Sequence, residues 1–305
     1  MATFVREVAV AGSYGEVPPG YRLPEALRLG PVVLMVSDLA RSVLFYERVL
    51  GMRVLEQTET YARIGAQMGQ EALLELRTAP GIRPRTGQPR LGLFHFALLL
   101  PDRASLGRFV RHLQELGVRA GAGDHFVSEA FYLDDPDGLG IEIYADRPRS
   151  EWQRVGRELV MGTDPVDVAD LIAAAGPMPW VGMPSGTVMG HLHLHVGDLA
   201  RGAAFYSDAI GFDRMVWSYP GALFLGAGGY HHHLGTNVWA GSGASAPPPN
   251  EARLLEWSMV LPSAADVDAV AASLERMGHA IERDAIDEAF RVVDPWGTML
   301  RVGTR

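Results

Sequence analysis

Cysteine and lysine are both absent from the 305-residue sequence, and each absence removes several kinds of chemistry. Without cysteine there is no disulfide, no thiolate metal ligand, no iron–sulfur cluster and no cysteine nucleophile. All 27 basic residues are arginine, which excludes Schiff-base chemistry and a Walker-type phosphate-binding lysine. Any metal ion must therefore be held by nitrogen and oxygen ligands.

Long hydrophobic runs are also missing, since no stretch approaches the ~18 apolar residues of a membrane-spanning helix. Arg6 and Glu7 interrupt the apolar N-terminal stretch, so it does not resemble a secretion signal. The 36 acidic residues outnumber the 27 basic ones, and the net charge of −9 disfavours nucleic acid or an anionic membrane as a partner. These features predict a cytoplasmic protein.

What the sequence does contain is an internal duplication. Residues 36–46 (VSDLARSVLFY) recur at 196–206 (VGDLARGAAFY), an offset of 160. Further along, Leu-Pro at 100 and 261 opens a second matching pair of segments, and Asp-Pro-X-Gly follows at 135 and 294. Each half of the chain therefore holds two related units, which we number one to four.

Every unit has the same predicted order of elements. A short apolar run is followed by Asp, Pro or Ser and by helix-spaced apolar residues, and then by alternating stretches broken at Gly or Asp-Pro turns. This pattern predicts a βαβββ unit and an α+β fold. The predicted organisation is an N-terminal extension (1–28), a first domain of units one and two (29–146), a connector (147–188) and a second domain of units three and four (189–305).

Four βαβββ units that carry the pattern D-L-x-R-S/G-x-x-F-Y-x-x-x-L/I-G resemble the vicinal oxygen chelate superfamily, also called the glyoxalase/bleomycin resistance/dioxygenase fold. The resemblance covers residues 29–146 and 189–305. It implies two domains built from curved mixed sheets, with one divalent metal between two facing units. The fold alone does not decide the activity.

The resemblance also implies where metal ligands lie, on the first and the last strand of a unit. The first-strand positions of units one to four are Pro31, His95, His191 and Glu256, and the last-strand positions of units two and four are Glu142 and Arg301. Proline offers no side-chain ligand and arginine is a fixed cation, so units one and four are poor metal sites. The expected ligands are His95, His191 and Glu142.

Two histidines and one carboxylate suit a facial triad of non-haem Fe(II), but they equally suit a hydrolytic zinc site with one open position.

A longer motif separates these alternatives. The stretch from Gly123 to Glu142 resembles the ring-cleavage signature of type I extradiol dioxygenases. That resemblance implies a histidine outside the metal ligands at His125, a tyrosine at Tyr132 and the metal-binding glutamate at Glu142. The matching positions of unit four are Asp284, Arg291 and Arg301.

The run Tyr230-His231-His232-His233 in unit three is the last candidate segment. Extradiol enzymes carry a His-His pair in the matching strand, and its second histidine handles protons on oxygen. Because side chains alternate along a strand, only one or two of these histidines can face a site. By motif position we expect His232, followed by His233.

Together these residues predict an Fe(II)-dependent dioxygenase, with Mn(II) as the alternative metal, that opens the ring of a catechol with O₂. Two other functions compete with it. A metal-free protein that sequesters a small aromatic would need no ligand triad, and a glyoxalase-like metal isomerase would use two glutamates among four ligands. A homo-oligomer is common in this superfamily.

Only one pairing of units collects the three ligands in one place. We expect units two and three to face each other around the metal, and units one and four to form a metal-free pair. In that second pair, Glu256 and Arg301 are predicted to form a salt bridge where a metal would otherwise lie.

Overall fold

The computed structural model describes residues 6–284 and 287–305. Each unit of the duplication folds as predicted, with one strand, one helix and three further strands. Unit one contains β3 (Val32–Met35), α1 (Leu39–Arg48), β4 (Arg53–Gln57), β5 (Tyr61–Gly65) and β6 (Ala72–Arg77). Unit two contains β7 (Gly92–Leu99), α2 (Arg103–Leu116), β8 (Gly121–Asp124), β9 (Ser128–Asp134) and β10 (Gly140–Asp146).

The second half repeats this order. Unit three contains β13 (Val188–His195), α4 (Leu199–Ala203) with its π-helical continuation η2 (Ala204–Ile210), β14 (Asp213–Val216), β15 (Ala222–Gly226) and β16 (Leu234–Asn237). Unit four contains β17 (Arg253–Val260), α5 (Ala264–Arg276), β18 (Ile281–Asp284), β19 (Ala289–Val293) and β20 (Met299–Gly303). The α+β class is therefore confirmed.

The residue before each helix explains why the helix starts there. Asp38, Asp102, Asp198 and Ser263 each accept a hydrogen bond from the backbone N–H three residues later. Such N-caps satisfy amides that have no partner inside the helix. The turn from strand to helix is thus encoded in the same way four times.

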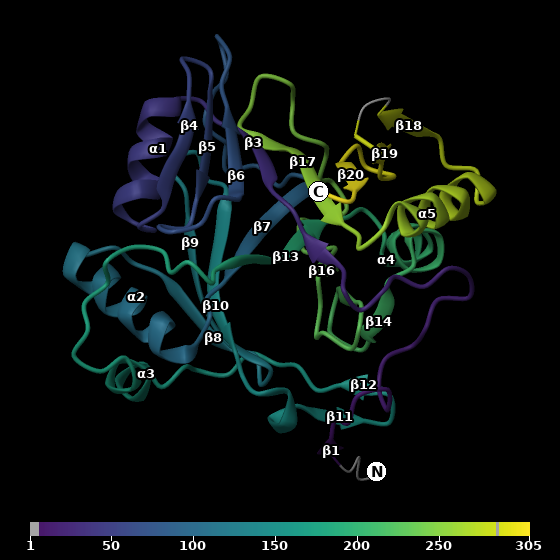
Figure 1. The fold of residues 1–305 in the computed structure, drawn as a ribbon, viewed down its shortest axis with the longest axis horizontal. Coiled ribbons are helices and arrows are strands. Elements are labelled where there is room, and N and C mark those ends of the chain that lie inside the picture. The colour runs from purple at the N-terminus through teal and green to yellow at the C-terminus, as the bar shows by residue number, and fades with distance from the viewer. Residues whose placement is uncertain (1–5, 285–286) are drawn as a thin grey trace.

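Two large sheets join the halves of the chain, as Figure 1 shows. Units three and two form an eight-stranded sheet in the order β14-β15-β16-β13-β7-β10-β9-β8. Units four and one form a nine-stranded sheet in the order β18-β19-β20-β17-β3-β6-β5-β4, with β2 (Arg28–Leu29) added beside β17. The expectation that unit two pairs with unit three, and unit one with unit four, is confirmed.

Contacts within each half hold the repeated motifs in place. The Tyr46 hydroxyl of α1 donates to Asp135 at 3.2 Å, and the Tyr206 hydroxyl of η2 donates to Asp294 at 2.7 Å. In both cases the tyrosine of the repeated Phe-Tyr pair holds the Asp-Pro turn of the next unit. Asp135 also accepts from the backbone N–H groups of Asp137 and Leu139. This turn sets where β10 begins and therefore where Glu142 lies.

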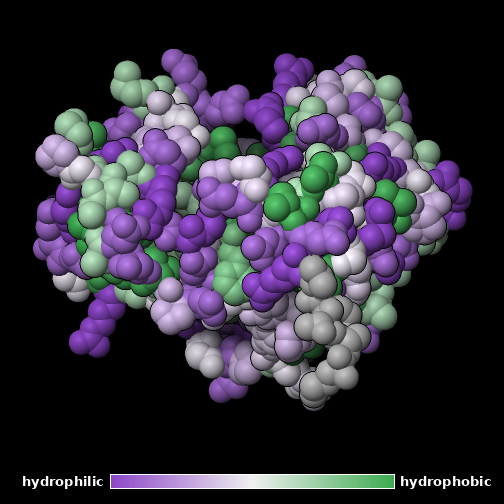
Figure 2. Space-filling view, turned by 90° about the horizontal axis from the view of Figure 1, so that it is seen from below, coloured by the Kyte–Doolittle hydropathy of each residue, from purple (hydrophilic) through white to green (hydrophobic). Residues whose placement is uncertain are grey.

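The remaining segments lie outside the two large sheets. A three-stranded sheet joins β1 (Glu7–Val8), β11 (Gln153–Val155) and β12 (Glu158–Leu159), and the connector adds η1 (Arg149–Glu151) and α3 (Val168–Ala174). The face shown in Figure 2 is mostly polar, with hydrophobic residues scattered among the charged ones. Among the residues described, none of the helices is long and apolar enough to cross a membrane.

Candidate metal centre and adjacent cavity

Three neighbouring strands of the eight-stranded sheet, β13, β7 and β10, bring the three predicted ligands together. On β7, Ala97 pairs with Glu142 of the parallel strand β10 on one side and with His191 of the antiparallel strand β13 on the other. Paired residues point to the same face of a sheet, and so does His95, two residues before Ala97. The register therefore places His95, His191 and Glu142 around the short side chain of Ala97.

The distances between the ligand atoms fit one metal ion. Glu142 Oε2 lies 2.9 Å from His95 Nε2 and 3.1 Å from His191 Nε2. Two ligands at right angles on a metal at about 2.1 Å lie about 3.0 Å apart. The His95 contact lacks the alignment of a hydrogen bond, so this buried nitrogen has no hydrogen-bond partner among the described residues. A buried nitrogen of this kind, facing a carboxylate, is suited to a metal.

Burial and mutual contact set the charges of this group. All three side chains are buried, with relative exposures of 5% or less. Burial lowers the pKa of His191, which keeps its ring neutral at neutral pH. Burial by itself would raise the pKa of Glu142, but the contacts with His191 and His95 hold it well below its usual value. The group therefore combines a carboxylate with neutral imidazole, as a divalent metal requires.

A cavity of about 220 Å³ opens beside the three ligands. Three of the residues expected at catalytic positions, His125, Tyr132 and His232, line it. Its remaining lining is mostly aromatic or apolar: Phe94, Met161, Gly162, Thr163, His193, Tyr219, Phe224 and Trp239. The size and the apolar wall suit a single aromatic ring, and no arginine lines the cavity.

His125 and Tyr132 form a hydrogen-bonded pair at the edge of the ligand group. His125 Nδ1 lies 2.7 Å from the Gly162 carbonyl and His125 Nε2 lies 2.6 Å from the Tyr132 hydroxyl. A carbonyl only accepts, so Nδ1 carries the hydrogen and Nε2 accepts from the tyrosine. Burial raises the pKa of Tyr132 well above its usual value, which keeps the hydroxyl protonated.

The connector contributes more to this cavity than the sequence indicates. It supplies the Gly162 carbonyl, and its Thr163 hydroxyl lies 3.2 Å from the Tyr219 hydroxyl, which closes the rim. A Cβ at Gly162 would lie 2.5 Å from the Phe126 ring, so a larger residue there would require that ring to move. Periodicity gives no sign of this role, because the segment belongs to none of the four units.

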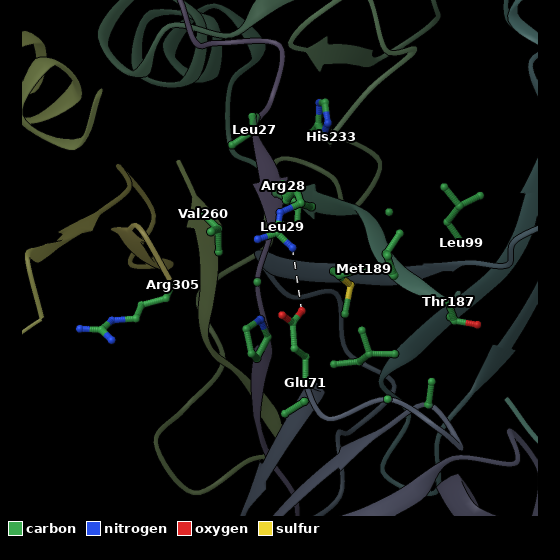
Figure 3. A pocket seen from close by; sticks show the side chains of 18 of the residues that line it. Leu27, Arg28, Leu29, Glu71, Leu99, Thr187, Met189, His233, Val260 and Arg305 are labelled. Atoms are coloured by element: carbon green, nitrogen blue, oxygen red, sulfur yellow. Dashed lines mark ion pairs between the residues drawn. The ribbon is translucent and has the colours of Figure 1, made fainter. Parts of the chain in front are cut away.

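The three consecutive histidines lie just before β16, outside any strand, and they separate in space. His232 lines the 220 Å³ cavity beside the three ligands, which we call the metal cavity. Its ring centroid lies 4.1 Å from that of His191. His233 lies at a second cavity of about 870 Å³, shown in Figure 3 with the Arg28–Glu71 ion pair on its wall. His233 Nδ1 accepts from the Ala227 backbone N–H at 3.2 Å, and burial lowers the pKa of His233 to about 3. The structure thus brings His232, but not His233, to the metal cavity.

His193 is a cavity residue that the motifs did not identify. It pairs with His95 across β13 and β7, and its buried Nε2 has no hydrogen-bond partner among the described residues. The alternation of His191 and His193 in the segment HLHLH places both on one face, so this signal was present in the sequence. Gly235 makes room for the ring, since a Cβ there would lie 2.9 Å from it.

Units four and one form no comparable ligand group among the residues described. The prediction that Glu256 pairs with Arg301 is wrong. The Glu256 carboxylate instead accepts a hydrogen bond from Arg291 Nε at 2.6 Å. Arg301 instead donates to the Arg305 carbonyl at 2.7 Å and lies 3.6 Å from Asp287. The long Arg291 side chain reaches from β19 across β20 to Glu256, and it occupies the place that Tyr132 has in unit two.

The fold and this ligand group define the class of protein. The family model of the Glyoxalase/Bleomycin resistance protein/Dioxygenase superfamily matches residues 28–143 and 188–302. The chain belongs to this superfamily, and the resemblance seen in the sequence is confirmed.

Particular relatives add detail. The chain is 46% identical over 275 residues, 89% of its length and 95% of the relative's, to the catechol-2,3-dioxygenase of Bacillus subtilis strain 168. Among solved structures, a putative dioxygenase from Bacillus subtilis has a TM-score of 0.64 at 14% identity, covering 93% of this chain and 86% of that one. Glyoxalase I from Zea mays has a TM-score of 0.54 at 19% identity, covering 91% and 92%. At these identities the two structures support the fold alone.

Proposed function

We propose that this protein is an extradiol dioxygenase that opens the ring of a catechol next to its two hydroxyl groups and places both atoms of O₂ in the product. The observation that carries the proposal is the convergence of His95, His191 and Glu142 beside a ring-sized cavity that His125, Tyr132 and His232 also line. The 46% identical relative, named catechol-2,3-dioxygenase, supports the same activity.

The metal we propose is Fe(II), with Mn(II) as the alternative, held by His95, His191 and Glu142. Ligand atoms that lie within 4.8 Å of one another and leave one side open to the cavity support this choice. When bound, the ion would supply Lewis acidity toward the catechol oxygens and a common centre for catechol and O₂. The identity of the metal remains part of the proposal.

The chain's own residues bind and orient the catechol. The neutral ring of His232, whose pKa burial holds well below its usual value, is placed to accept the proton of a catechol hydroxyl. Tyr132 keeps its proton and directs it to His125, so its oxygen lone pairs face the cavity as acceptors. Phe94, Tyr219 and Trp239 wall the cavity and exclude water from the reacting ring.

Aerobic and anaerobic assays of the Fe(II)-loaded protein test this function. With catechol and O₂ we expect a yellow ring-opened semialdehyde, one O₂ consumed per catechol, and no product without O₂. His191→Ala should abolish the product, whereas His279→Ala, a histidine that lines neither cavity, should retain it.

Two results would contradict the proposal. Wild-type protein that cannot be loaded with metal but still binds catechol would indicate a sequestering protein. Metal-loaded protein that converts a substrate without O₂ would indicate an isomerase. We also propose the domain limits 29–146 and 189–305 for the two halves. A cytoplasmic location and a homo-oligomer stay predictions.

A further inference from the structure

A chain of hydrogen bonds leads away from the metal cavity through two residues that the ring-cleavage motif does not include. His232 Nδ1 lies 2.7 Å from His231 Nδ1, and His231 Nε2 lies 2.9 Å from Asp146 Oδ1. His231 is completely buried, and the Asp146 side chain, at the end of β10, is 26% exposed. The chain thus connects the cavity wall with the solvent side of the sheet.

The acceptor at one end of this chain decides where the hydrogens lie. A carboxylate only accepts, so His231 donates its Nε2–H to Asp146. With one hydrogen on the His231 ring, Nδ1 keeps a lone pair. His232 must then donate its Nδ1–H to that lone pair. The remaining nitrogen of His232, Nε2, is then left without a hydrogen, and His232 lines the cavity.

Neighbouring groups hold the chain in this geometry. The Tyr230 hydroxyl donates a second hydrogen bond to Asp146 at 3.4 Å and lies 2.7 Å from the Tyr144 hydroxyl. The His232 ring packs between His191 and Phe224, with centroid distances of 4.1 and 4.9 Å. Neither ring can turn freely: His231 is bonded through both of its nitrogens, and His232 is bonded through Nδ1 and packed on its faces.

We infer that Asp146 and His231 are positioning residues that fix His232 as the Nδ1–H tautomer, with the Nε2 lone pair directed at the substrate. The inference rests on the proposed dioxygenase function, in which His232 accepts the proton of a catechol hydroxyl. A proton acceptor with the wrong tautomer would present an N–H to that hydroxyl and could not take its proton. The carboxylate therefore acts on the reaction through two imidazoles, without touching the substrate.

The first test measures the tautomer directly. In ¹⁵N-histidine-labelled protein without a paramagnetic metal, long-range ¹H–¹⁵N spectra distinguish protonated from unprotonated ring nitrogens. His232→Asn identifies the His232 signals among the ten histidines. We expect Nδ1 protonated and Nε2 unprotonated in the wild type, and a mixture of tautomers in Asp146→Asn, whose amide can donate or accept. An Nε2–H on His232 of the wild type would overturn the inference.

The second test separates positioning from binding by kinetics. Asp146→Ala should lower kcat by about 10- to 100-fold, the size of loss known for hydrogen-bonded partners of metal-binding histidines, with KM within about twofold and metal content unchanged. Asp146→Glu should restore part of the loss. Asp208→Asn is the matched control, because its side chain is 25% exposed and pairs with one arginine, Arg214, away from the cavity.

Substitutions of His231 test the middle of the chain. His231→Asn keeps an amide oxygen close to the position of Nδ1 and should retain more activity than His231→Leu, which offers no acceptor. Equal kcat for wild type, Asp146→Ala and His231→Leu at equal metal content would refute the positioning role. A wild type inactive on every catechol would refute the proposed function instead, and the ¹⁵N spectra would still decide the tautomer.

Discussion

Metal binding through Glu142 should stabilise the folded chain by an amount that one substitution removes. At a free metal concentration about 100 times Kd, binding to the folded state contributes about 2.7 kcal/mol. For a chain of 305 residues this corresponds to a rise in Tm of about 4 °C. Glu142 is the anionic member of the ligand group and lies within 3.1 Å of both imidazoles.

Glu142→Gln removes that anion and keeps the shape of the side chain. If metal affinity falls about 100-fold, the same metal concentration is only about equal to the new Kd, and the stabilisation drops to about 0.4 kcal/mol. Calorimetric scans with Fe(II) under nitrogen, or with Mn(II), should then show a Tm rise under about 1 °C for the variant.

The duplication supplies a matched control for this experiment. Glu75 lies on β6, the last strand of unit one, as Glu142 does in unit two, and it pairs with Arg77. Glu75→Gln should keep the full metal-dependent rise in Tm. An equal rise in wild type and Glu142→Gln would refute the ligand assignment, whatever the activity of either protein.

Three further predictions concern the groups around the ligands. Tyr132→Phe removes the 2.6 Å hydrogen bond to His125 and should lower kcat by about 10²-fold without loss of metal, as measured by steady-state kinetics and elemental analysis. Gly235→Ala places a Cβ 2.9 Å from the His193 ring and should cost about 1–3 kcal/mol in urea unfolding. Burial raises the pKa of Asp135 from 3.8 to about 6. The folded wild-type protein therefore becomes less stable against unfolding as the pH rises between these two values. As the pH rises across that range, the free energy of unfolding of Asp135→Asn should increase by about 3 kcal/mol relative to that of the wild type.

Clear outcomes would contradict these predictions. A Tyr132→Phe enzyme with unchanged kcat would mean that the hydroxyl takes no part in the reaction. Gly243→Ala, where no atom lies within 4 Å of the added Cβ, is the control for Gly235→Ala and should be close to neutral. A pH-independent difference between wild type and Asp135→Asn would show that the buried carboxyl titrates normally.

The sequence by itself determined the repeating architecture and half of the site. The βαβββ order follows from apolar periodicity and from one capping residue before each helix, which are local properties of the chain. His95 and Glu142 lie within one unit, and the Asp-Pro turn fixes the register that brings them together. A motif within one stretch of chain could therefore predict them.

The rest of the site depends on contacts between residues far apart in the chain, which the sequence indicated only through the resemblance to a known superfamily. Sheet pairing of unit two with unit three brings His191 to Glu142, 49 residues away. Motif position favoured His232 over His233, but the tertiary structure decides where each lies: His232 lines the metal cavity and His233 lines the other one. The choice of Arg291 over Arg301 as the partner of Glu256 likewise depends on side-chain reach across the sheet, which no local pattern encodes.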